Sequence, residues 1–150
     1  MPMRLDKIVP GLQAAEIVGD ADVEVADLAY DSRKAGPGTL FFCVPGLESD
    51  GHDFAPAAVE GGAMALVCQR ALDLGVTEVR VADARAAMAP AASAFYDDPT
   101  SDLVVAGITG TNGKTTTAFL LHAILESSGM HSGLMGTVKQ LVGGEQEEVT

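Results

Sequence analysis

The apolar positions divide the first hundred residues into short strands and helices that alternate along the chain. Residues 23–30 alternate between apolar and other side chains, which is typical of a half-buried strand. Residues 39–44 and 64–68 are continuous apolar runs, and such runs are typical of buried strands. We predict four strands in this part, at 23–30, 39–44, 64–68 and 77–82.

Three helical segments accompany these strands. A weak helical pattern over residues 4–18 is interrupted by Pro10 and Gly11. A short helix is predicted over 53–60 with Asp53 as its N-cap, and an alanine-rich one over 83–96 with Asp83 as its N-cap. Pro90 lies inside the second, where a proline costs about 3 kcal/mol, so we expect a kink there or two helical pieces.

The pattern restarts after a linker at residues 97–101. A strand is predicted over 103–108, a glycine-rich loop follows it, and a helix begins at Lys114 and ends near Ser127, with Gly129 as its C-cap. A further strand is expected within 132–138, and a turn or hairpin tip over 143–148. We therefore divide the chain into an N-terminal domain, 1–100, and the incomplete beginning of a second domain, 101–150.

Composition supports an α/β fold. The 150 residues are 47% hydrophobic and contain 17 glycines and no tryptophan. Alanine and valine outnumber the aromatic residues, which suits small side chains between helices and a sheet. Cys43 and Cys68 each lie in an apolar run, so we interpret them as buried hydrophobic residues rather than a disulfide or metal ligands.

The chain has a formal net charge of −12, which makes nucleic acid a poor partner. An anionic ligand must therefore be held by local donors, by helix N-termini or by a metal ion. No signal peptide and no apolar stretch of membrane-spanning length is visible, so we expect a cytoplasmic protein without membrane insertion. We also expect a monomer.

The glycine-rich loop at residues 107–117, GITGTNGKTTT, is the most specific chemical signal. Backbone N–H groups from Gly110, Thr111, Asn112 and Gly113 can surround a phosphate, and Lys114 can reach the β- and γ-phosphates. Thr115 is the expected Mg²⁺ ligand, and Thr116 could hydrogen-bond a phosphate. The first glycine of the general pattern G-x-x-x-x-G-K-[ST] is displaced, because Ile108 stands where it is expected. The alternative is a glycine-rich turn without a ligand.

Two other segments carry polar residues near predicted strand ends. Asp31, Ser32 and Arg33 follow the first strand, either as a simple turn or as ligand-binding groups at the carboxyl edge of a sheet. His52 is more simply a packing or helix-start residue than a catalyst. His122 and His131 lack neighbours at metal-ligand spacing.

Taken together, these segments resemble the Mur ligases, the ATP-dependent amide-forming enzymes of peptidoglycan precursor synthesis. The motifs are DSRKxxPGxLFF at 31–42, DGHDF at 50–54, VADARAA at 81–87, FYDDP at 95–99 and the glycine-rich loop, whose displaced glycine the family shares. Within the family, the chain resembles most the ligases that add the third residue of the peptide (the MurE type). The alternatives are the ligases that add D-Ala-D-Ala (the MurF type) and a non-catalytic nucleotide-binding fragment.

The resemblance implies a small N-terminal α/β domain that binds the uridine nucleotide, followed by the start of a P-loop, parallel-sheet ATPase domain. It implies that Tyr30 and Ser32 contact the uridine end of UDP-N-acetylmuramoyl-dipeptide, with Leu47, Glu48 and Ser49 beside it. ATP would be held by residues 110–116, with Lys114 in the catalytic role and Mg²⁺ on Thr115.

The implied reaction joins diaminopimelate or lysine to the dipeptide through an acyl phosphate, and the sequence does not distinguish the two amino acids. The family's carbamylated lysine and amino-acid-selecting motif do not lie within these 150 residues. We therefore expect the 150 residues alone not to ligate.

Overall fold

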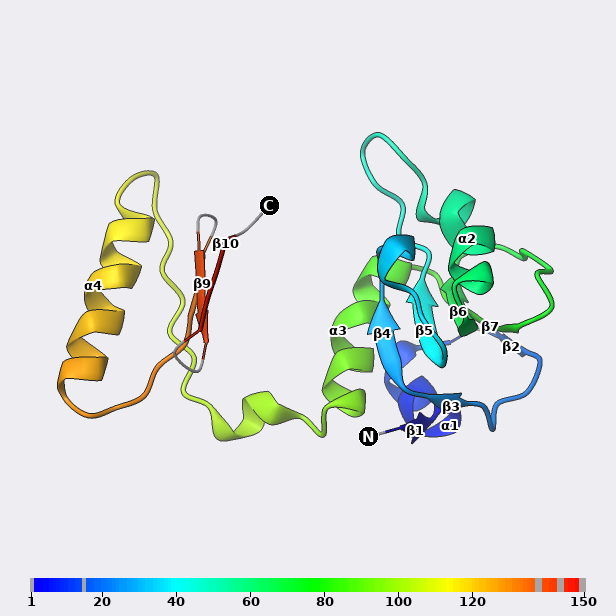
Figure 1. Ribbon diagram of the computed structural model, residues 1–150, viewed down its shortest axis with the longest axis horizontal. Coiled ribbons are helices and arrows are strands. Elements are labelled where there is room, and N and C mark those ends of the chain that lie inside the picture. Colours follow the sequence, from blue (N-terminus) through cyan, green and yellow to red (C-terminus); the bar gives the residue numbers. More distant parts are fainter. Residues whose placement is uncertain (1, 15, 137–138, 143–144, 149–150) are drawn as a thin grey trace. The chain divides into compact units, whose positions relative to one another are not determined.

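The computed structural model describes residues 2–14, 16–136, 139–142 and 145–148. The chain forms two compact units, Met1–Leu103 and Val104–Thr150. Each unit is described by itself below (Figure 1).

A five-stranded mixed sheet is the centre of the first unit, with strand order β2-β7-β6-β5-β4. Four neighbouring strands, β7, β6, β5 and β4, run parallel to one another, and the edge strand β2 pairs with β7 in the antiparallel direction. The strands are β2 (Glu16–Val18), β4 (Asp27–Ala29), β5 (Thr39–Phe42), β6 (Ala63–Cys68) and β7 (Thr77–Arg80). A separate two-stranded sheet pairs β1 (Met3–Arg4) with β3 (Glu24–Val25).

Helices cover both faces of this sheet (Figure 1). Side chains alternate along β5, so Leu40 and Phe42 pack on one face and Phe41 and Cys43 on the other. The first face is covered by α1 (Leu5–Ile8), by the 3₁₀ turn η1 (Val9–Leu12) and by α3 (Ala84–Phe95), and the second by α2 (Ala55–Glu60). This layering is what parallel strands require, because both of their faces must be buried.

The predicted strands at 39–44, 64–68 and 77–82 are confirmed as β5, β6 and β7. The predicted strand at 23–30 is instead two short strands, β3 and β4, which belong to different sheets. Its neighbour along the chain, β2, lies in the segment where we expected only a weak helix.

The predicted helix at 83–96 is confirmed as α3, and the Asp83 carboxylate caps it by accepting hydrogen bonds from Arg85 and Ala86 N–H groups. The helix continues through Pro90 as one element, so of the two outcomes expected there, a kink or two pieces, the second is wrong. A Cβ placed on Gly11 would lie 3.4 Å from the Pro90 Cβ. The proline therefore stands where η1 crosses the helix closely.

Asp53 is not the N-cap that we predicted. The 3₁₀ turn η3 (Gly51–Phe54) precedes α2, and Asp50 caps this turn by accepting a hydrogen bond from the His52 N–H. Phe54 occupies the N-cap position of α2 without a side-chain hydrogen bond. The acidic cap thus lies three residues earlier, since the chain begins to coil before the α-helix starts.

The second unit contains α4 (Lys114–Ser127) and an antiparallel sheet of β8 (Leu134–Met135), β9 (Lys139–Val142) and β10 (Glu145–Glu148). The predicted helix is confirmed, and Gly129 after it has a left-handed φ of 80°. β8 accounts for part of the strand expected within 132–138, while residues 137–138 lie outside the described residues. Residues 145–148 are a strand rather than a turn, and 143–144 also lie outside the described residues.

The apolar run at 103–108 is not a strand in the structure. Val104 is 103% exposed and Val105 is 76% exposed. A buried parallel strand depends on neighbouring strands and on helices over both faces. The sheet that the structure describes in this unit is antiparallel and does not include the run. The side-chain pattern predicted burial, but the described residues supply no partner for it.

Candidate functional site

The glycine-rich loop leads directly into the N-terminus of α4. Gly110 has a φ of 153°, and Gly113, at the N-cap of α4, has a left-handed φ of 78°. The left-handed conformation at Gly113 is one that side chains other than glycine rarely adopt. The sequence thus turns sharply and begins the helix at Lys114.

Several backbone donors at this loop remain available to a ligand. The first hydrogen bond of the helix runs from the Thr117 N–H to the Gly113 carbonyl oxygen. The N–H groups of the preceding helical residues point out of the helix start, where the helix dipole is positive. The Lys114 Nζ lies over the loop and donates to the Gly110 carbonyl oxygen at 2.6 Å. The loop therefore combines a cation with unpaired amides, which is the chemistry of a phosphate cradle.

The predicted ATP-binding residues are all on the surface. The structure brings Gly110, Thr111, Asn112, Gly113, Lys114, Thr115 and Thr116 together in one exposed turn and the first helical turn. Thr115 is the second residue of α4 and its side chain is exposed, so its hydroxyl can reach a metal ion held by phosphates. Among the described residues, no group of three or more His, Cys, Asp or Glu side chains is arranged to hold a metal. A metal at this loop would therefore depend on Thr115 and on the phosphates themselves.

A second candidate site lies where β4 ends. A cavity of about 400 Å³ is lined by Tyr30, Asp31, Ser32, Arg33 and Phe54. The turn η2 (Ser32–Lys34) follows β4, and Asp31 caps it by accepting a hydrogen bond from the Arg33 N–H. Tyr30 is 69% exposed and Phe54 is 45% exposed. Two exposed aromatic rings beside a hydroxyl and a guanidinium can stack on a base and bind polar groups.

The charges in this cavity are paired with each other. The Arg33 Nε donates to Asp31 Oδ1 at 2.9 Å, and the Arg33 Nη2 donates to Asp31 Oδ2 at 2.7 Å. The guanidinium, together with the Arg33 N–H, lowers the pKa of Asp31 to about 2. The side chain of Arg33 remains 87% exposed. A strongly exposed guanidinium at the mouth of the cavity is free to contact an anionic ligand.

Leu47, Glu48 and Ser49 do not line this cavity. They form the exposed tip of a hairpin between β5 and η3, whose base is the antiparallel bridge between Pro45 and Asp50. Leu47 is fully exposed. The structure thus separates the five predicted uridine-contacting residues into a cavity and a hairpin tip.

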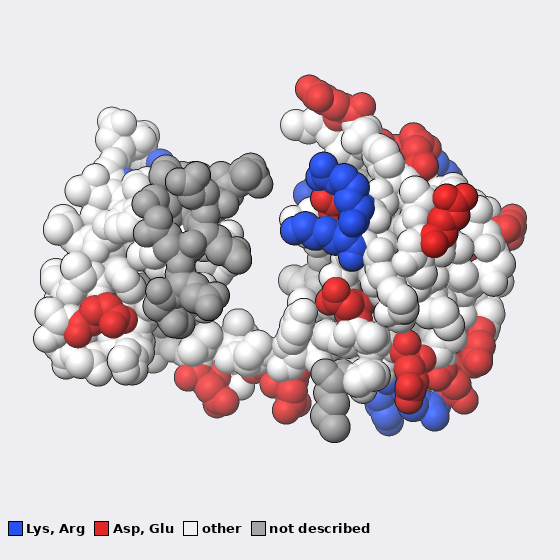
Figure 2. All heavy atoms as spheres, in the orientation of Figure 1, with Lys and Arg blue, Asp and Glu red and all other residues white. Residues whose placement is uncertain are grey.

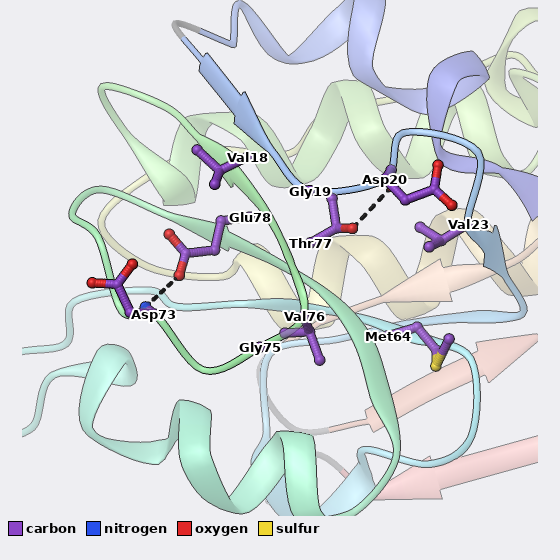
Figure 3. A pocket seen from close by; sticks show the side chains of 10 residues that line it. All are labelled: Val18, Gly19, Asp20, Val23, Met64, Asp73, Gly75, Val76, Thr77 and Glu78. Carbon is purple, nitrogen blue, oxygen red and sulfur yellow. Dashed lines mark hydrogen bonds between the residues drawn. The ribbon is translucent and has the colours of Figure 1, made fainter.

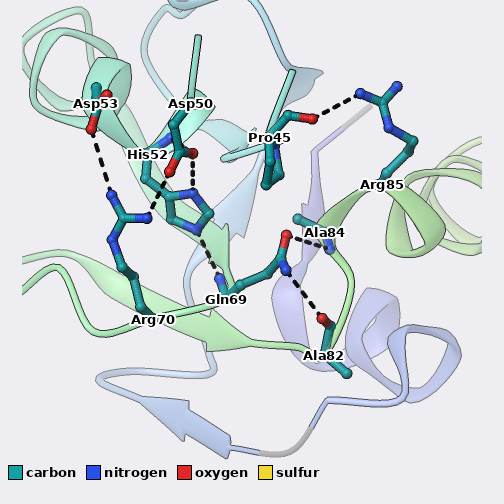
Figure 4. A network of polar contacts seen from close by, with 9 residues as sticks. All are labelled: Pro45, Asp50, His52, Asp53, Gln69, Arg70, Ala82, Ala84 and Arg85. Atoms are coloured by element: carbon teal, nitrogen blue, oxygen red, sulfur yellow. Dashed lines mark hydrogen bonds and ion pairs between the residues drawn. The ribbon is translucent and has the colours of Figure 1, made fainter. Parts of the chain in front are cut away.

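A network of polar contacts holds the base of this hairpin (Figure 4). His52 is buried and binds Asp50 and the backbone of Gln69, which confirms its interpretation as a structural residue. Sequence reasoning missed Arg70, Arg85 and Phe54. Only their positions after β6, at the start of α3 and in the DGHDF motif would have pointed to them.

The buried cysteines take no part in either site. Cys43 and Cys68 are free and buried on neighbouring strands, as predicted. Burial raises the pKa of the Cys43 thiol to about 12 and that of the Cys68 thiol to about 11. Both thiols are therefore protonated and unreactive at neutral pH.

A larger cavity, of about 580 Å³, lies at the other edge of the sheet, near the starts of β6 and β7 (Figure 3). Glu78 lines it, but its carboxylate accepts hydrogen bonds from the N–H groups of Leu72 and Asp73 and from Arg80. Thr77 is likewise occupied, because its hydroxyl donates to the Asp20 carbonyl oxygen. The polar groups here hold loops and offer little to a ligand.

Acidic side chains are scattered over the visible face, whereas basic ones gather in a few places (Figure 2). This distribution agrees with the net charge of −12. An anion must therefore be attracted by the local donors just described rather than by the overall field. Among the described residues, no helix has the length and apolar character needed to cross a bilayer.

Two family models match the chain, and together they span nearly all of it after residue 23. The model of the Mur ligase family, catalytic domain, matches residues 24–106, and the model of the Mur ligase middle domain matches residues 108–150. The chain belongs to the Mur ligase family.

One relative is the UDP-N-acetylmuramoyl-L-alanyl-D-glutamate–2,6-diaminopimelate ligase 1 of Clostridium acetobutylicum. It is 45% identical over 148 residues, which are 97% of this chain and 31% of the relative. The solved structure of a ligase of the same name, without the number, aligns with a TM-score of 0.68 and 26% identity over 97% of this chain and 30% of that one. MurF from Acinetobacter baumannii aligns with a TM-score of 0.68 and 27% identity over 85% and 28%. The chain spans about a third of the length of these relatives.

Proposed function

We propose that this chain is the nucleotide-binding portion of an ATP-dependent ligase that adds the third amino acid to UDP-N-acetylmuramoyl-L-Ala-D-Glu in peptidoglycan precursor synthesis. The observation that carries the proposal is the loop at residues 110–116, where Lys114 and the free amides of α4 meet. The 45% identity to the UDP-N-acetylmuramoyl-L-alanyl-D-glutamate–2,6-diaminopimelate ligase 1 of Clostridium acetobutylicum supports the dipeptide as the substrate that is extended.

Each unit has its own role in this proposal. The N-terminal domain, residues 1–100, binds the uridine end through Tyr30 and Ser32 and through the hairpin tip at Leu47–Ser49. The segment 101–150 begins the ATPase domain. We place the enzyme in the cytoplasm, as a monomer.

The reaction joins two anions, the dipeptide carboxylate and the γ-phosphate of ATP. A carboxylate oxygen attacks the γ-phosphorus, ADP leaves, and an acyl phosphate remains. The amine of the incoming amino acid then attacks the acyl carbon, phosphate leaves, and the amine loses a proton. Charge neutralisation and positioning dominate such a reaction.

Lys114 neutralises the transferring phosphoryl group, and the amides of residues 110–113 fix the triphosphate. In the structure the Lys114 ammonium rests on the Gly110 carbonyl oxygen, so it is already held over the loop. Thr115 would hold Mg²⁺, which neutralises phosphate charge when it is bound. No general base is identified in these 150 residues.

The test is phosphate release by the full gene product. We expect ATP-dependent release with UDP-N-acetylmuramoyl-dipeptide plus diaminopimelate or lysine, and none when the dipeptide substrate is omitted. ATP hydrolysis that is indifferent to this substrate would contradict the proposal.

The second candidate is a D-Ala-D-Ala-adding ligase of the MurF type. It is kept because the Acinetobacter baumannii MurF structure aligns with the same TM-score, 0.68, as the diaminopimelate ligase structure does. It predicts that a UDP-N-acetylmuramoyl-tripeptide and D-Ala-D-Ala support phosphate release and that the dipeptide does not. The same assay therefore separates the two candidates.

A further inference from the structure

The hairpin at residues 45–50 is short and tightly closed. The Gly46 N–H donates to the Ser49 carbonyl oxygen at 2.8 Å, and Pro45 and Asp50 form the bridge at its base. The Gly51 N–H then donates to the Val44 carbonyl oxygen at 3.1 Å. The tip, Leu47–Ser49, projects from this closed base.

The Asp50 carboxylate anchors one end of the hairpin. Its Oδ2 accepts a hydrogen bond from Arg70 Nη1 at 2.7 Å, and its Oδ1 contacts His52 Nδ1 at 2.6 Å (Figure 4). Arg70 also lies 3.5 Å from Asp53. Because Arg70 lies two residues after the end of β6, this ion pair ties the hairpin to the end of a central strand.

The buried imidazole of His52 completes this anchor. Its Nε2 accepts the Gln69 N–H at 2.9 Å, so the Nδ1 carries the proton and donates to Asp50. The Gln69 side chain donates to the Ala82 carbonyl oxygen, which links the same strand end to the start of α3. The anchor therefore joins the hairpin to the residues that follow β6.

The other end of the hairpin is held from α3. Arg85 Nη2 donates to the Pro45 carbonyl oxygen at 3.0 Å. Arg85 lies in the first turn of the helix, and Asp83 caps that turn. Two arginines, from two different elements, thus fix the two residues that close the hairpin.

We propose that Arg70 and Arg85 are positioning residues for the uridine end of the substrate, because they hold the 45–50 hairpin so that Leu47–Ser49 meet the ligand in a preformed geometry. This inference rests on the proposed function. Neither arginine needs to touch the substrate. Preorganisation of this kind strengthens binding by removing the cost of ordering the loop.

The experiment compares steady-state kinetics of the full gene product with those of Arg70→Gln and Arg85→Gln. The exposed ion pair of Arg70 and the hydrogen bond of Arg85 to a carbonyl oxygen each contribute about 1 kcal/mol, so each variant should raise the KM for UDP-N-acetylmuramoyl-dipeptide by about fivefold. The kcat and the KM for ATP should stay at their wild-type values. Arg70→Lys should restore part of the affinity, since a lysine can still pair with Asp50.

Arg4→Gln is the matched control. The side chain of Arg4 is 48% exposed and that of Arg70 is 52% exposed, and each pairs with two carboxylates. Arg4 pairs with Asp6 and Asp22, away from the hairpin, so its loss should change none of the three parameters. The inference is overturned if the KM for the dipeptide substrate is unchanged in both Arg70→Gln and Arg85→Gln. It is also overturned if kcat falls and both KM values rise to the same extent. A wild-type protein that does not bind UDP would instead overturn the proposed function.

Discussion

Gly51 shows how one residue can determine a local path of the chain. A Cβ on Gly51 would lie 2.5 Å from the Val44 nitrogen and 2.6 Å from the Val44 carbonyl oxygen. Both neighbours are backbone atoms, so a larger residue must move β5 or the start of η3.

We therefore predict that Gly51→Ala destabilises the N-terminal unit by about 2 kcal/mol or more, as overpacking does. Urea unfolding measures the free energy of unfolding of each variant, and hydrogen exchange of the β5 amides measures the local effect. Gly36→Ala is the matched control, because its Cβ would meet no atom within 4 Å, and its effect should stay within about 0.5 kcal/mol. Equal stability of the two variants would contradict the account.

The carboxylate of Asp50 should make the free energy of unfolding depend on pH. Arg70 first, and then the backbone and side chain of His52, hold the pKa of Asp50 well below its ordinary value of 3.8. A lowered carboxyl pKa in the folded state stabilises the protein above the unfolded-state pKa, and this stability is lost as the pH falls. Asp53 also faces Arg70 and adds to the same charge cluster.

Asp50→Asn should therefore be less stable than the wild type at pH 7, and the difference should shrink as the pH falls below about 4. Thermal unfolding of both proteins across this pH range measures the difference. A gap that stays constant with pH would show that the loss is one of packing rather than of charge.

Single residues could be interpreted correctly from the sequence where their partners are close along the chain. Asp83 as a cap and the buried cysteines are examples. Asp53 was misjudged because a 3₁₀ turn precedes α2, and nothing in the local pattern distinguishes the two acidic residues. Arg70 and Arg85 could not be found, because their partners are 20 and 40 residues away.

Among the elements, α3 is continuous despite Pro90. The proline removes one helical hydrogen bond, and it lies where η1 approaches the helix. Pro90→Ala keeps the Cβ and restores the missing N–H donor.

We predict that Pro90→Ala stabilises the N-terminal unit by about 1 kcal/mol, since the regained bond outweighs the entropy that proline removes from the unfolded chain. Pro99→Ala is the control, because Pro99 opens a 3₁₀ turn where no N–H donor is needed. The comparison of the two melting temperatures decides the point. A Pro90→Ala variant that melts below the wild type would mean that the ring packing against η1 is worth more than the bond.

The buried strands β5 and β6 were the elements most readily predicted, since their apolar runs are continuous. β2 was missed because Glu16–Val18 is short and exposed, and its pairing with β7 joins residues about 60 apart. The run at 103–108 has the composition of a strand, but strand formation also depends on partners that the pattern cannot supply. Periodicity reports which faces are apolar, not what they pair with.

At the scale of the whole molecule, we propose that each of the two units binds its own nucleotide. UDP should protect backbone amides near Tyr30–Arg33 and at the 45–50 hairpin from hydrogen exchange. ATP with Mg²⁺ should protect amides in 110–117. Exchange measured on the full gene product with each nucleotide alone tests this, and protection of the same unit by both nucleotides would contradict it.

Nucleotide affinity of Lys114→Ala, measured by calorimetry on the full gene product, tests the central claim most directly. A charge-assisted hydrogen bond is worth about 1.5–3 kcal/mol, so the variant should bind ATP at least about tenfold more weakly. Lys34→Ala, in the other unit, should bind ATP like the wild type. If Lys114→Ala keeps the wild-type affinity for ATP, the loop at 110–116 does not hold the triphosphate, and the assignment fails.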